Sequence, residues 1–412
     1  MTRVALLIIC IFSTVSIIHG QPEQVPYVIL VSFDGFRHDY VTRFHAPNFK
    51  AFATKGTQAD GLIPSFPSKT FPNHYTLVTG LYPGHHGLVD NSFYDPARQE
   101  FFGMKLHGRV TDPFYYGGIP LWQLAKQHGV KSASFFWVGS ELPQPELHPD
   151  YYFPYDESVP DTARVEQVLQ WLKLPEDQRP HFIALYFSSP DHESHLYGPA
   201  SKETRRAVLH ADALLSRLML NLEKIKLPVN VILVSDHGML EAKQQSETYI
   251  FLDEVMNVDD PSIKISNGGT QTHIYVADKN DCDSLYNSLK TKAINFSVYR
   301  QMDFPARWHY QTARSGDILI TAHEGYYIRE RNRVKFLKTL KTGSVFGVHG
   351  YDASEVRDMQ GIFLAQGPNI KAGLKIPAFE NIHVYPLIAK ILHLTIPTTD
   401  GRIQVLERAY QK

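Results

Sequence analysis

Three carboxylates and three imidazoles in this sequence could together bind metal ions. They are Asp34, Asp191, His195, Asp236, His237 and His349. Carboxylate oxygens and imidazole nitrogens form a ligand set suited to two hard-to-borderline divalent ions. A hydroxyl nucleophile needs activation of this kind, and Thr70, within residues 68–74, offers the hydroxyl. This combination predicts a two-metal enzyme in which Thr70 attacks phosphorus.

The spacing of the candidate ligands indicates how each could reach an ion. Asp191 and His195 are four residues apart, so the first turn of a helix would place both on one face. Asp236 and His237 are adjacent and would point to opposite faces of a strand, so the chain must turn there, which the following glycine permits. His349 lies in a glycine-rich segment. Each motif alone is more often a cap, a turn or a solvated residue, so the prediction rests on their combination.

The residues around Thr70 predict the start of a helix. Pro72 suits the first position of a helix that runs to Thr79, and Gly80 would end it. Thr70 would then lie just ahead of the helix, where unpaired N–H groups favour a phosphate. Ser68 is a rival hydroxyl, and local sequence alone would make both hydroxyls helix caps. The candidate metal ligands elsewhere favour Thr70 as a nucleophile.

Short apolar runs in the sequence predict strands that end near the candidate carboxylate ligands. Residues 27–33, 182–187 and 229–234 have the continuous apolar pattern of strands buried on both faces of a parallel sheet. Helical patterns, such as residues 161–172 and 202–225, separate them. This alternation predicts an α/β fold, a doubly wound sandwich. Each strand leads into a candidate ligand, and ligands in such sheets lie beyond the carboxyl ends of the strands.

The pattern changes between about residues 240 and 345. Residues 272–276, 296–300 and 317–321 indicate strands, and residues 281–292 indicate a helix. We therefore expect a smaller α+β insertion here, after which the chain returns to the main sheet.

The whole chain has the composition of a folded globular protein. Of its 412 residues, 43% are hydrophobic and 20% are charged, and the formal net charge is −1. These values exclude a disordered or fibrous protein. They also provide no basic field to recruit long nucleic acid or an anionic membrane surface. We expect a small-molecule substrate, and the sequence does not predict protein partners.

Residues 1–20 predict a secretory signal peptide, because Arg3 precedes an apolar run that ends in small or polar residues. Its cleavage would remove Cys10 and leave Cys282 alone, so residues 21–412 would fold without an internal disulfide. No apolar stretch near the C-terminus predicts a stable membrane anchor. We expect a secreted or periplasmic protein.

Five segments resemble the nucleotide pyrophosphatase/phosphodiesterase family of the alkaline phosphatase superfamily. They are residues 67–75, 79–91, 191–199, 235–239 and 347–352. The resemblance implies a three-layer α/β/α sandwich of the alkaline phosphatase type, with the α+β insertion inside one catalytic domain. It also implies a minimal domain, similar to bacterial members of the family.

The resemblance further implies two zinc ions and assigns their ligands. Asp191, His195 and His349 match the ligands of one zinc. The other zinc would be held by Asp34, Asp236, His237 and the Thr70 oxygen. Thr70 matches the nucleophile, which would form a phospho-threonine intermediate, and Asn91 matches an amide that binds a non-bridging phosphate oxygen.

Substrate choice is the least determined point. Phe71 and Tyr155 match the aromatic pair with which the family stacks a nucleobase, so we expect hydrolysis of nucleotide phosphodiester or pyrophosphate bonds to nucleoside 5′-monophosphates. The same chemistry on lysophospholipid or choline phosphodiesters is an alternative. A phosphomonoesterase would need extra positive charge, for which Lys69 is the basic residue beside the nucleophile, although its side chain can simply face solvent. A non-catalytic binding protein is a further alternative.

Overall fold

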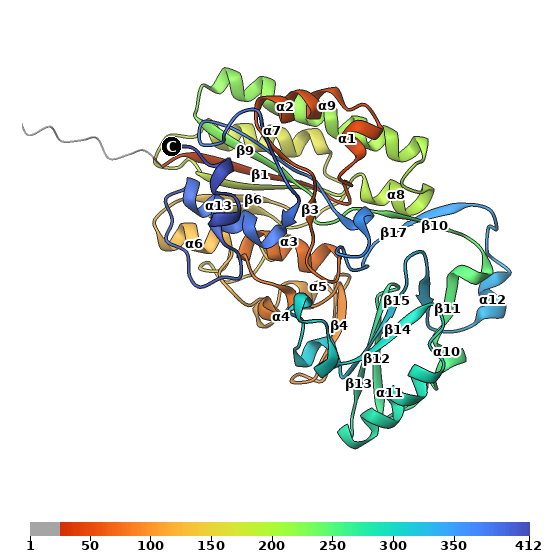
Figure 1. Ribbon diagram of the computed structural model, residues 1–412. Helices are drawn as coiled ribbons and strands as arrows, with labels where there is room; N and C mark the ends of the chain where they lie inside the picture. Colours follow the sequence, from red (N-terminus) through yellow and green to blue (C-terminus); the bar gives the residue numbers. More distant parts are fainter. Residues whose placement is uncertain (1–24) are drawn as a thin grey trace, which may run out of the picture.

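The fold is centred on an eight-stranded sheet. In this computed structural model, which describes residues 25–412, the strand order is β19-β2-β18-β9-β1-β8-β6-β7 (Figure 1). In chain order, the strands are β1 (Tyr27–Phe33), β2 (Thr57–Ala59), β6 (Ser132–Phe135), β7 (Tyr151–Phe153), β8 (Phe182–Phe187), β9 (Val229–Val234), β18 (Phe363–Gln366) and β19 (Leu374–Ile376). Strands β9, β1, β8, β6 and β7 run parallel, whereas β18 is antiparallel to both of its neighbours.

Helices cover both faces of this sheet, so the predicted α/β/α sandwich is confirmed. One face carries α1 (Tyr40–Arg43), α2 (Pro47–Lys55), α7 (Asp161–Leu172) and α9 (Lys202–Ile225); the other carries α3 (Thr70–Thr79), α6 (Leu121–Gln127) and α13 (Val384–Ile391) (Figure 1). Strand β1 shows the alternation that this arrangement requires. Its residues Val28 and Leu30 belong to one buried core, and Ile29 and Val31 belong to the core on the opposite face.

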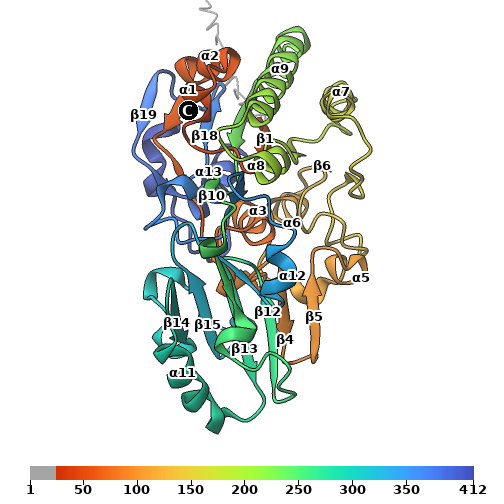
Figure 2. The same ribbon diagram turned by 90° about the vertical axis from the view of Figure 1, so that its right-hand side faces the viewer.

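A smaller lobe lies beside the sandwich (Figure 2). Its four-stranded antiparallel sheet has the order β12-β13-β15-β14, and helix α11 packs against it. The elements are β12 (Ile263–Asn267), β13 (Gln271–Val276), α11 (Cys282–Thr291), β14 (Phe296–Arg300) and β15 (Ile318–Ala322). Further short elements of this stretch are β11 (Tyr249–Phe251), α10 (Leu252–Val255), β16 (Tyr327–Arg329) and α12 (Arg333–Leu337).

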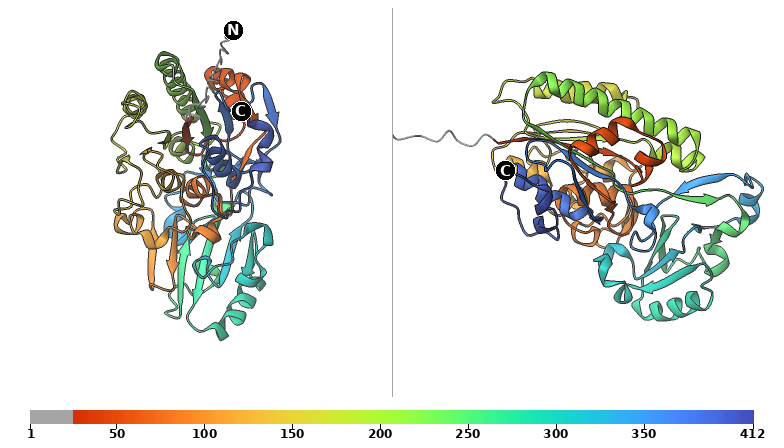
Figure 3. Two further views of the ribbon diagram at one scale, coloured as in Figure 1. Left: turned by 90° about the vertical axis from the view of Figure 1, so that its left-hand side faces the viewer. Right: turned by 45° about the horizontal axis from the view of Figure 1, so that its top comes forward.

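An antiparallel ribbon links the two lobes. Strand β10 (Leu240–Lys243) leaves the larger lobe and pairs with β17 (Val345–Val348), which returns to it. The C-terminus lies on the larger lobe, on the side away from the four-stranded sheet (Figure 3). The ribbon therefore brings the chain back to the sandwich directly at His349.

Helix α3 begins earlier than the sequence suggested. It starts at Thr70, with Lys69 at the N-cap, so Pro72 occupies its third position and the prediction of Pro72 as the first helical residue was wrong. The N–H groups of the whole first turn have no acceptor inside the helix, so proline is tolerated throughout that turn. Gly80 ends the helix as expected, with a φ of 66° in the left-handed region.

Two expectations concern the ends of the chain and its relation to membranes. The predicted signal peptide, residues 1–20, lies outside the described residues. Among residues 25–412, no helix is both long enough and apolar enough to cross a bilayer. Cys282 is a free, half-buried thiol at the start of α11.

Candidate metal centre and nucleophile

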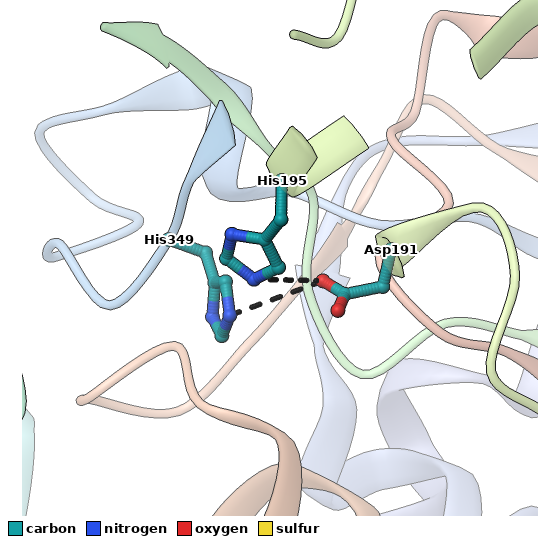
Figure 4. Close-up of side chains that lie close together, drawn as sticks. All are labelled: Asp191, His195 and His349. Atoms are coloured by element: carbon teal, nitrogen blue, oxygen red, sulfur yellow. Dashed lines mark ion pairs between the residues drawn. The ribbon is translucent and has the colours of Figure 1, made fainter. Parts of the chain in front are cut away.

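Asp191, His195 and His349 form the first of two side-chain clusters. Asp191 begins helix α8 (Asp191–Tyr197), and His195 follows one turn later on the same face. His349 comes from the segment directly after β17. The Oδ1 atom of Asp191 lies 3.4 Å from Nε2 of His195 and 3.9 Å from Nε2 of His349 (Figure 4). One candidate ligand atom from each residue lies within 4.8 Å of the others, so a single ion could contact all three.

Asp34, Asp236 and His237 form the second cluster, at the ends of β1 and β9. The Nε2 atom of His237 lies 3.0 Å from Oδ2 of Asp236 and 3.6 Å from Oδ1 of Asp34. All three residues are buried, and their candidate ligand atoms again lie within 4.8 Å of one another. Directly after this pair, a Cβ atom on Gly238 would lie only 2.2 Å from the carbonyl oxygen of Asp358, so a residue without a side chain is required there. Although Asp236 and His237 are adjacent in sequence, both belong to the same cluster.

The two clusters adjoin each other. The imidazole rings of His237 and His349, one from each cluster, stack with centroids 3.6 Å apart and an interplanar angle of 13°. Two ions held by the clusters would therefore be close enough to act on one substrate group.

Each of the three histidines presents Nε2 to its cluster. Their Nδ1–H groups all donate to backbone carbonyl oxygens, which fixes both the tautomer and the ring orientation. His195, His237 and His349 donate to Gly347, Gly238 and Ser68, respectively, each at 2.8 Å. Burial, with the neighbouring charge of His237, also lowers the pKa of His349 well below its usual value, which favours the neutral form that binds metals.

Asp34 and Asp236 each accept a hydrogen bond at one carboxylate oxygen, which leaves the other oxygen available to a metal ion. The hydroxyl of Tyr186 donates to Oδ2 of Asp34 at 2.7 Å, and the backbone N–H of Gly35 donates to Oδ1 of Asp236 at 3.1 Å. Among residues 25–412, the remaining oxygens, Asp34 Oδ1 and Asp236 Oδ2, are buried without a hydrogen-bond partner, as is Oδ1 of Asp191. These unpartnered atoms all point into the two clusters.

This electrostatic arrangement fits bound cations. Burial, together with the negative charges of Asp236 and Asp191, raises the pKa of Asp34 well above its usual value. Unpartnered buried carboxylate oxygens are unfavourable, and a divalent cation would both satisfy them and stabilise the ionised form. The oxygen and nitrogen donors of the two clusters suit zinc, manganese or cobalt.

The structure separates the two candidate hydroxyls. Thr70 Oγ1 lies 3.4 Å from Nε2 of His237 and is partly exposed. The hydroxyl of Ser68 is fully buried, donates to the carbonyl oxygen of Tyr351 at 2.7 Å and accepts from the N–H of Gly350 at 3.0 Å. Thr70 is therefore the hydroxyl placed to reach a substrate, and Ser68 links two chain segments.

The side chain of Asn91, twelve residues after the end of helix α3, contacts the first turn of that helix. Its Oδ1 atom accepts a hydrogen bond from the N–H of Phe71 at 2.8 Å, so it caps a free donor of the first turn. Because the amide oxygen is engaged, Nδ2 is the group that could donate to a ligand beside Thr70. In helix α3, only Thr70 and Phe71 are not fully buried, so the open side of the helix is its N-terminal end.

Comparison with known families identifies the family to which the chain belongs. The family model of type I phosphodiesterases/nucleotide pyrophosphatases matches residues 28–352, which span both clusters. The chain belongs to this family. Its fold is accordingly that of the alkaline phosphatase superfamily, as the resemblance implied.

Members of this family that resemble the chain include human ectonucleotide pyrophosphatase/phosphodiesterase family member 1, 34% identical over 92% of this chain and 41% of the human protein. The venom phosphodiesterase CdcPDE of Crotalus durissus collilineatus is 36% identical over 92% of this chain and 46% of its own length. The chain thus spans less than half of these curated relatives. Among solved structures, an inactive alanine-for-threonine form of murine ectonucleotide pyrophosphatase/phosphodiesterase 5 with AMP has a TM-score of 0.85 at 29% identity, covering 94% of this chain and 100% of that one.

Tyr155 lies on the Asp34 side of the candidate site. Its ring centroid is 6.2 Å from that of Tyr186, whose hydroxyl holds Asp34. The side chain is 45% exposed and its backbone N–H donates to Glu141 at 3.0 Å. Its partial exposure leaves a face open to solvent, whereas a ring that only filled the core would be buried.

Two residues of the site were not found from the sequence. His74 lies one helical turn after Thr70 and donates from Nδ1 to the carbonyl oxygen of Thr70 at 3.0 Å, with that nitrogen 3.5 Å from Asp236. Tyr186 supports Asp34 from strand β8. The available signals were the four-residue spacing from Thr70 and a tyrosine within an otherwise apolar strand.

Removing the Tyr186 hydroxyl tests how strongly it supports Asp34. We expect Tyr186→Phe to weaken metal binding at the Asp34 cluster by about 10- to 100-fold, because Asp34 loses the donor that orients it. Competition with a chromophoric chelator measures the affinity. Tyr385→Phe is the matched control, since it removes a hydroxyl that donates to Ile119, away from the site. Equal affinities in the two variants would contradict the supporting role.

Proposed function

We propose that this protein is an exported, zinc-dependent phosphodiesterase/pyrophosphatase that cleaves nucleotides to nucleoside 5′-monophosphates. One observation carries the proposal. Thr70, an accessible hydroxyl at a helix N-terminus, lies beside two adjoining clusters that contain three buried, unpartnered carboxylate oxygens. The signal-peptide pattern of residues 1–20 and the similarity to venom phosphodiesterases support export.

The two side-chain clusters would each hold one metal ion for the reaction. When bound, two zinc ions would lower the pKa of the attacking alcohol and stabilise charge on the leaving oxygen. Asp34, Asp236 and His237 would hold one ion beside Thr70, and Asp191, His195 and His349 would hold the other.

Thr70 would carry the nucleotidyl group, bonded through its phosphorus, between two displacements. In the first, a bond forms between Thr70 Oγ1 and phosphorus while the bond from phosphorus to the leaving group breaks. In the second, a water oxygen bonds to phosphorus and the threonine oxygen is released, which restores the enzyme. The Nδ2 group of Asn91 would donate to a non-bridging oxygen, where negative charge develops. The inactive alanine-for-threonine form of the murine relative is consistent with a threonine nucleophile.

The position of Lys69 favours a diester over a monoester substrate. Its side chain does not face solvent, which the sequence had left open, because it is only 7% exposed. Its ammonium instead donates to the carbonyl oxygens of Gly268 and His349. It is therefore committed to backbone groups, whereas a doubly charged phosphate monoester would need a free cation beside Thr70.

A nucleotide substrate would place its base against Phe71 and Tyr155. Phe71 follows the nucleophile directly, and Tyr155 is on the Asp34 side of the site. The AMP bound to the murine relative supports this class of substrate. Turnover of p-nitrophenyl thymidine 5′-phosphate should exceed that of p-nitrophenylphosphorylcholine. A strong preference for the choline ester would instead assign the site to choline or lysophospholipid diesters, and no turnover of either would indicate a binding protein.

Removing an aromatic ring should change substrate binding more than catalysis. We expect Tyr155→Ala to raise KM for the nucleotide ester by about 5- to 150-fold, the equivalent of ~1–3 kcal/mol of base stacking, with a smaller change in kcat. Tyr151→Ala is the matched control, because this partly exposed tyrosine begins strand β7, which ends two residues before Tyr155, and its hydroxyl donates to Gln178, outside the site. If both variants kept the wild-type KM, stacking on Tyr155 would be refuted.

A further inference from the structure

Lys69 is a buried lysine that joins three separate parts of the chain. It is the N-cap residue of helix α3, immediately before Thr70. Its Nζ donates to the carbonyl oxygen of Gly268 at 2.8 Å and to that of His349 at 3.1 Å. Gly268 lies in the turn between β12 and β13 of the smaller lobe, and His349 lies on the chain that returns after β17. One ammonium group therefore ties the nucleophile helix, the smaller lobe and a candidate metal ligand together.

The packing around this lysine is tight on the side of His349. A Cβ atom added to Gly350 would lie 2.5 Å from Cε of Lys69 and 2.0 Å from Oγ1 of Thr270. Gly350 has a φ of 121°, a conformation that other residues rarely adopt. The chain after His349 thus passes so close to Lys69 that only glycine fits without displacement.

The ammonium group is also costly to bury. Among the described residues, it forms no ion pair with a carboxylate within 4.0 Å, and burial lowers its pKa despite the charges of Asp90 and Asp191. Two carbonyl hydrogen bonds offset only part of the desolvation cost. An apolar side chain of similar length would fill the space without that cost, so the directed hydrogen bonds are the specific contribution of the lysine.

These hydrogen bonds complete the fixation of His349. Its ring is oriented by the Nδ1–H bond to Ser68, at 2.8 Å. Its backbone carbonyl accepts from Lys69 and, at 3.2 Å, from the hydroxyl of Thr270. Ser68 thus orients the ring of His349, and Lys69, the next residue, holds its backbone. Both residues directly precede Thr70.

We propose that Lys69 is a positioning residue that fixes His349, and with it the Asp191–His195–His349 metal cluster, relative to the nucleophile Thr70. The proposal rests on the proposed function for the role of the metals and of Thr70. Lys69 acts through the His349 carbonyl, to which its ammonium group donates. Its removal should therefore disturb one metal site selectively, and the alignment of that site with Thr70.

The test is Lys69→Met, which keeps an unbranched side chain one atom shorter than lysine and removes its donors. Lys126→Met is the matched control, because the Lys126 ammonium also donates to two backbone carbonyls, those of Pro145 and His148, away from the site. Zinc chloride is titrated into each metal-free full chain against a chromophoric chelator. We expect Lys69→Met to weaken one of the two zinc equivalents by about tenfold or more, with the other unchanged, and Lys126→Met to weaken neither. With saturating zinc, kcat for Lys69→Met should fall while KM for the nucleotide ester stays within about twofold.

Each outcome decides the role of Lys69. A folded Lys69→Met protein that binds both zinc equivalents with wild-type affinity would overturn it, whatever its activity. If Lys69→Met does not fold, Lys69→Gln removes the charge and shortens the reach toward the His349 carbonyl, and wild-type zinc affinity in that variant would equally overturn the proposal. Failure of the proposed function would show differently, as an active Thr70→Ala enzyme, and would leave the zinc titrations valid.

Discussion

Replacing Thr70 by alanine is expected to lower kcat for a p-nitrophenyl nucleotide by at least about a thousandfold, because the hydroxyl that we propose attacks phosphorus is lost. The fold should persist, since Thr70 is partly exposed at the first position of helix α3 and its side-chain hydroxyl makes only a long contact, 3.4 Å, with His237. Asp34, Asp236 and His237 remain to hold a metal ion. Steady-state kinetics and the zinc content of the purified variant measure the two effects.

Ser68→Ala is the control that separates nucleophile from structure. Its hydroxyl bridges to Gly350 and Tyr351, so its loss should reduce stability and have a much smaller effect on kcat than the loss of Thr70. Rapid quenching with a nucleotide substrate should also yield a protein whose mass is increased by the nucleotidyl group, located by peptide mapping on Thr70. An active Thr70→Ala enzyme together with an inactive Ser68→Ala enzyme would refute Thr70 as the nucleophile.

Elements with strong local patterns could be predicted from the sequence. Strands β1, β8 and β9 and helices α7 and α9 have the bounds that the apolar runs and helical periodicity indicated. In these segments local preference and burial favour the same structure. The strand ends then brought the candidate ligands together, because the carboxyl ends of parallel strands lie at one edge of the sheet.

Features that depend on contacts distant in sequence could not be predicted in the same way. The surroundings of Lys69 come from residues about 200 and 280 positions further along the chain, so its burial leaves no local pattern. The support of Asp34 by Tyr186 likewise depends on the register between β1 and β8. The start of α3 was misplaced because proline is compatible with every position of a first turn.

The two clusters should lose their metals independently when one carboxylate is neutralised. In Asp236→Asn, the amide keeps the shape of the side chain but replaces an anionic ligand oxygen that has no other partner. We expect this variant to lose one of two zinc equivalents and at least about a hundredfold in kcat. Inductively coupled plasma mass spectrometry of the desalted protein measures the zinc content. Asp191→Asn should lose the other equivalent, which makes the two variants controls for each other.

The change in Tm when a chelator removes zinc gives a second measure of whether the two metal sites are independent. A ligand that binds the native state stabilises it in proportion to the logarithm of its concentration over Kd, so removal of zinc should lower the Tm of the wild-type protein. Each single variant has one site fewer to lose, and its Tm should fall by less. The rings of His237 and His349 stack 3.6 Å apart, so some coupling between the sites is expected in affinity, but not in stoichiometry. Loss of both zinc equivalents in Asp236→Asn would show that the clusters form one site, in which neither ion is held without the other, and would contradict the assignment of three protein ligands to each.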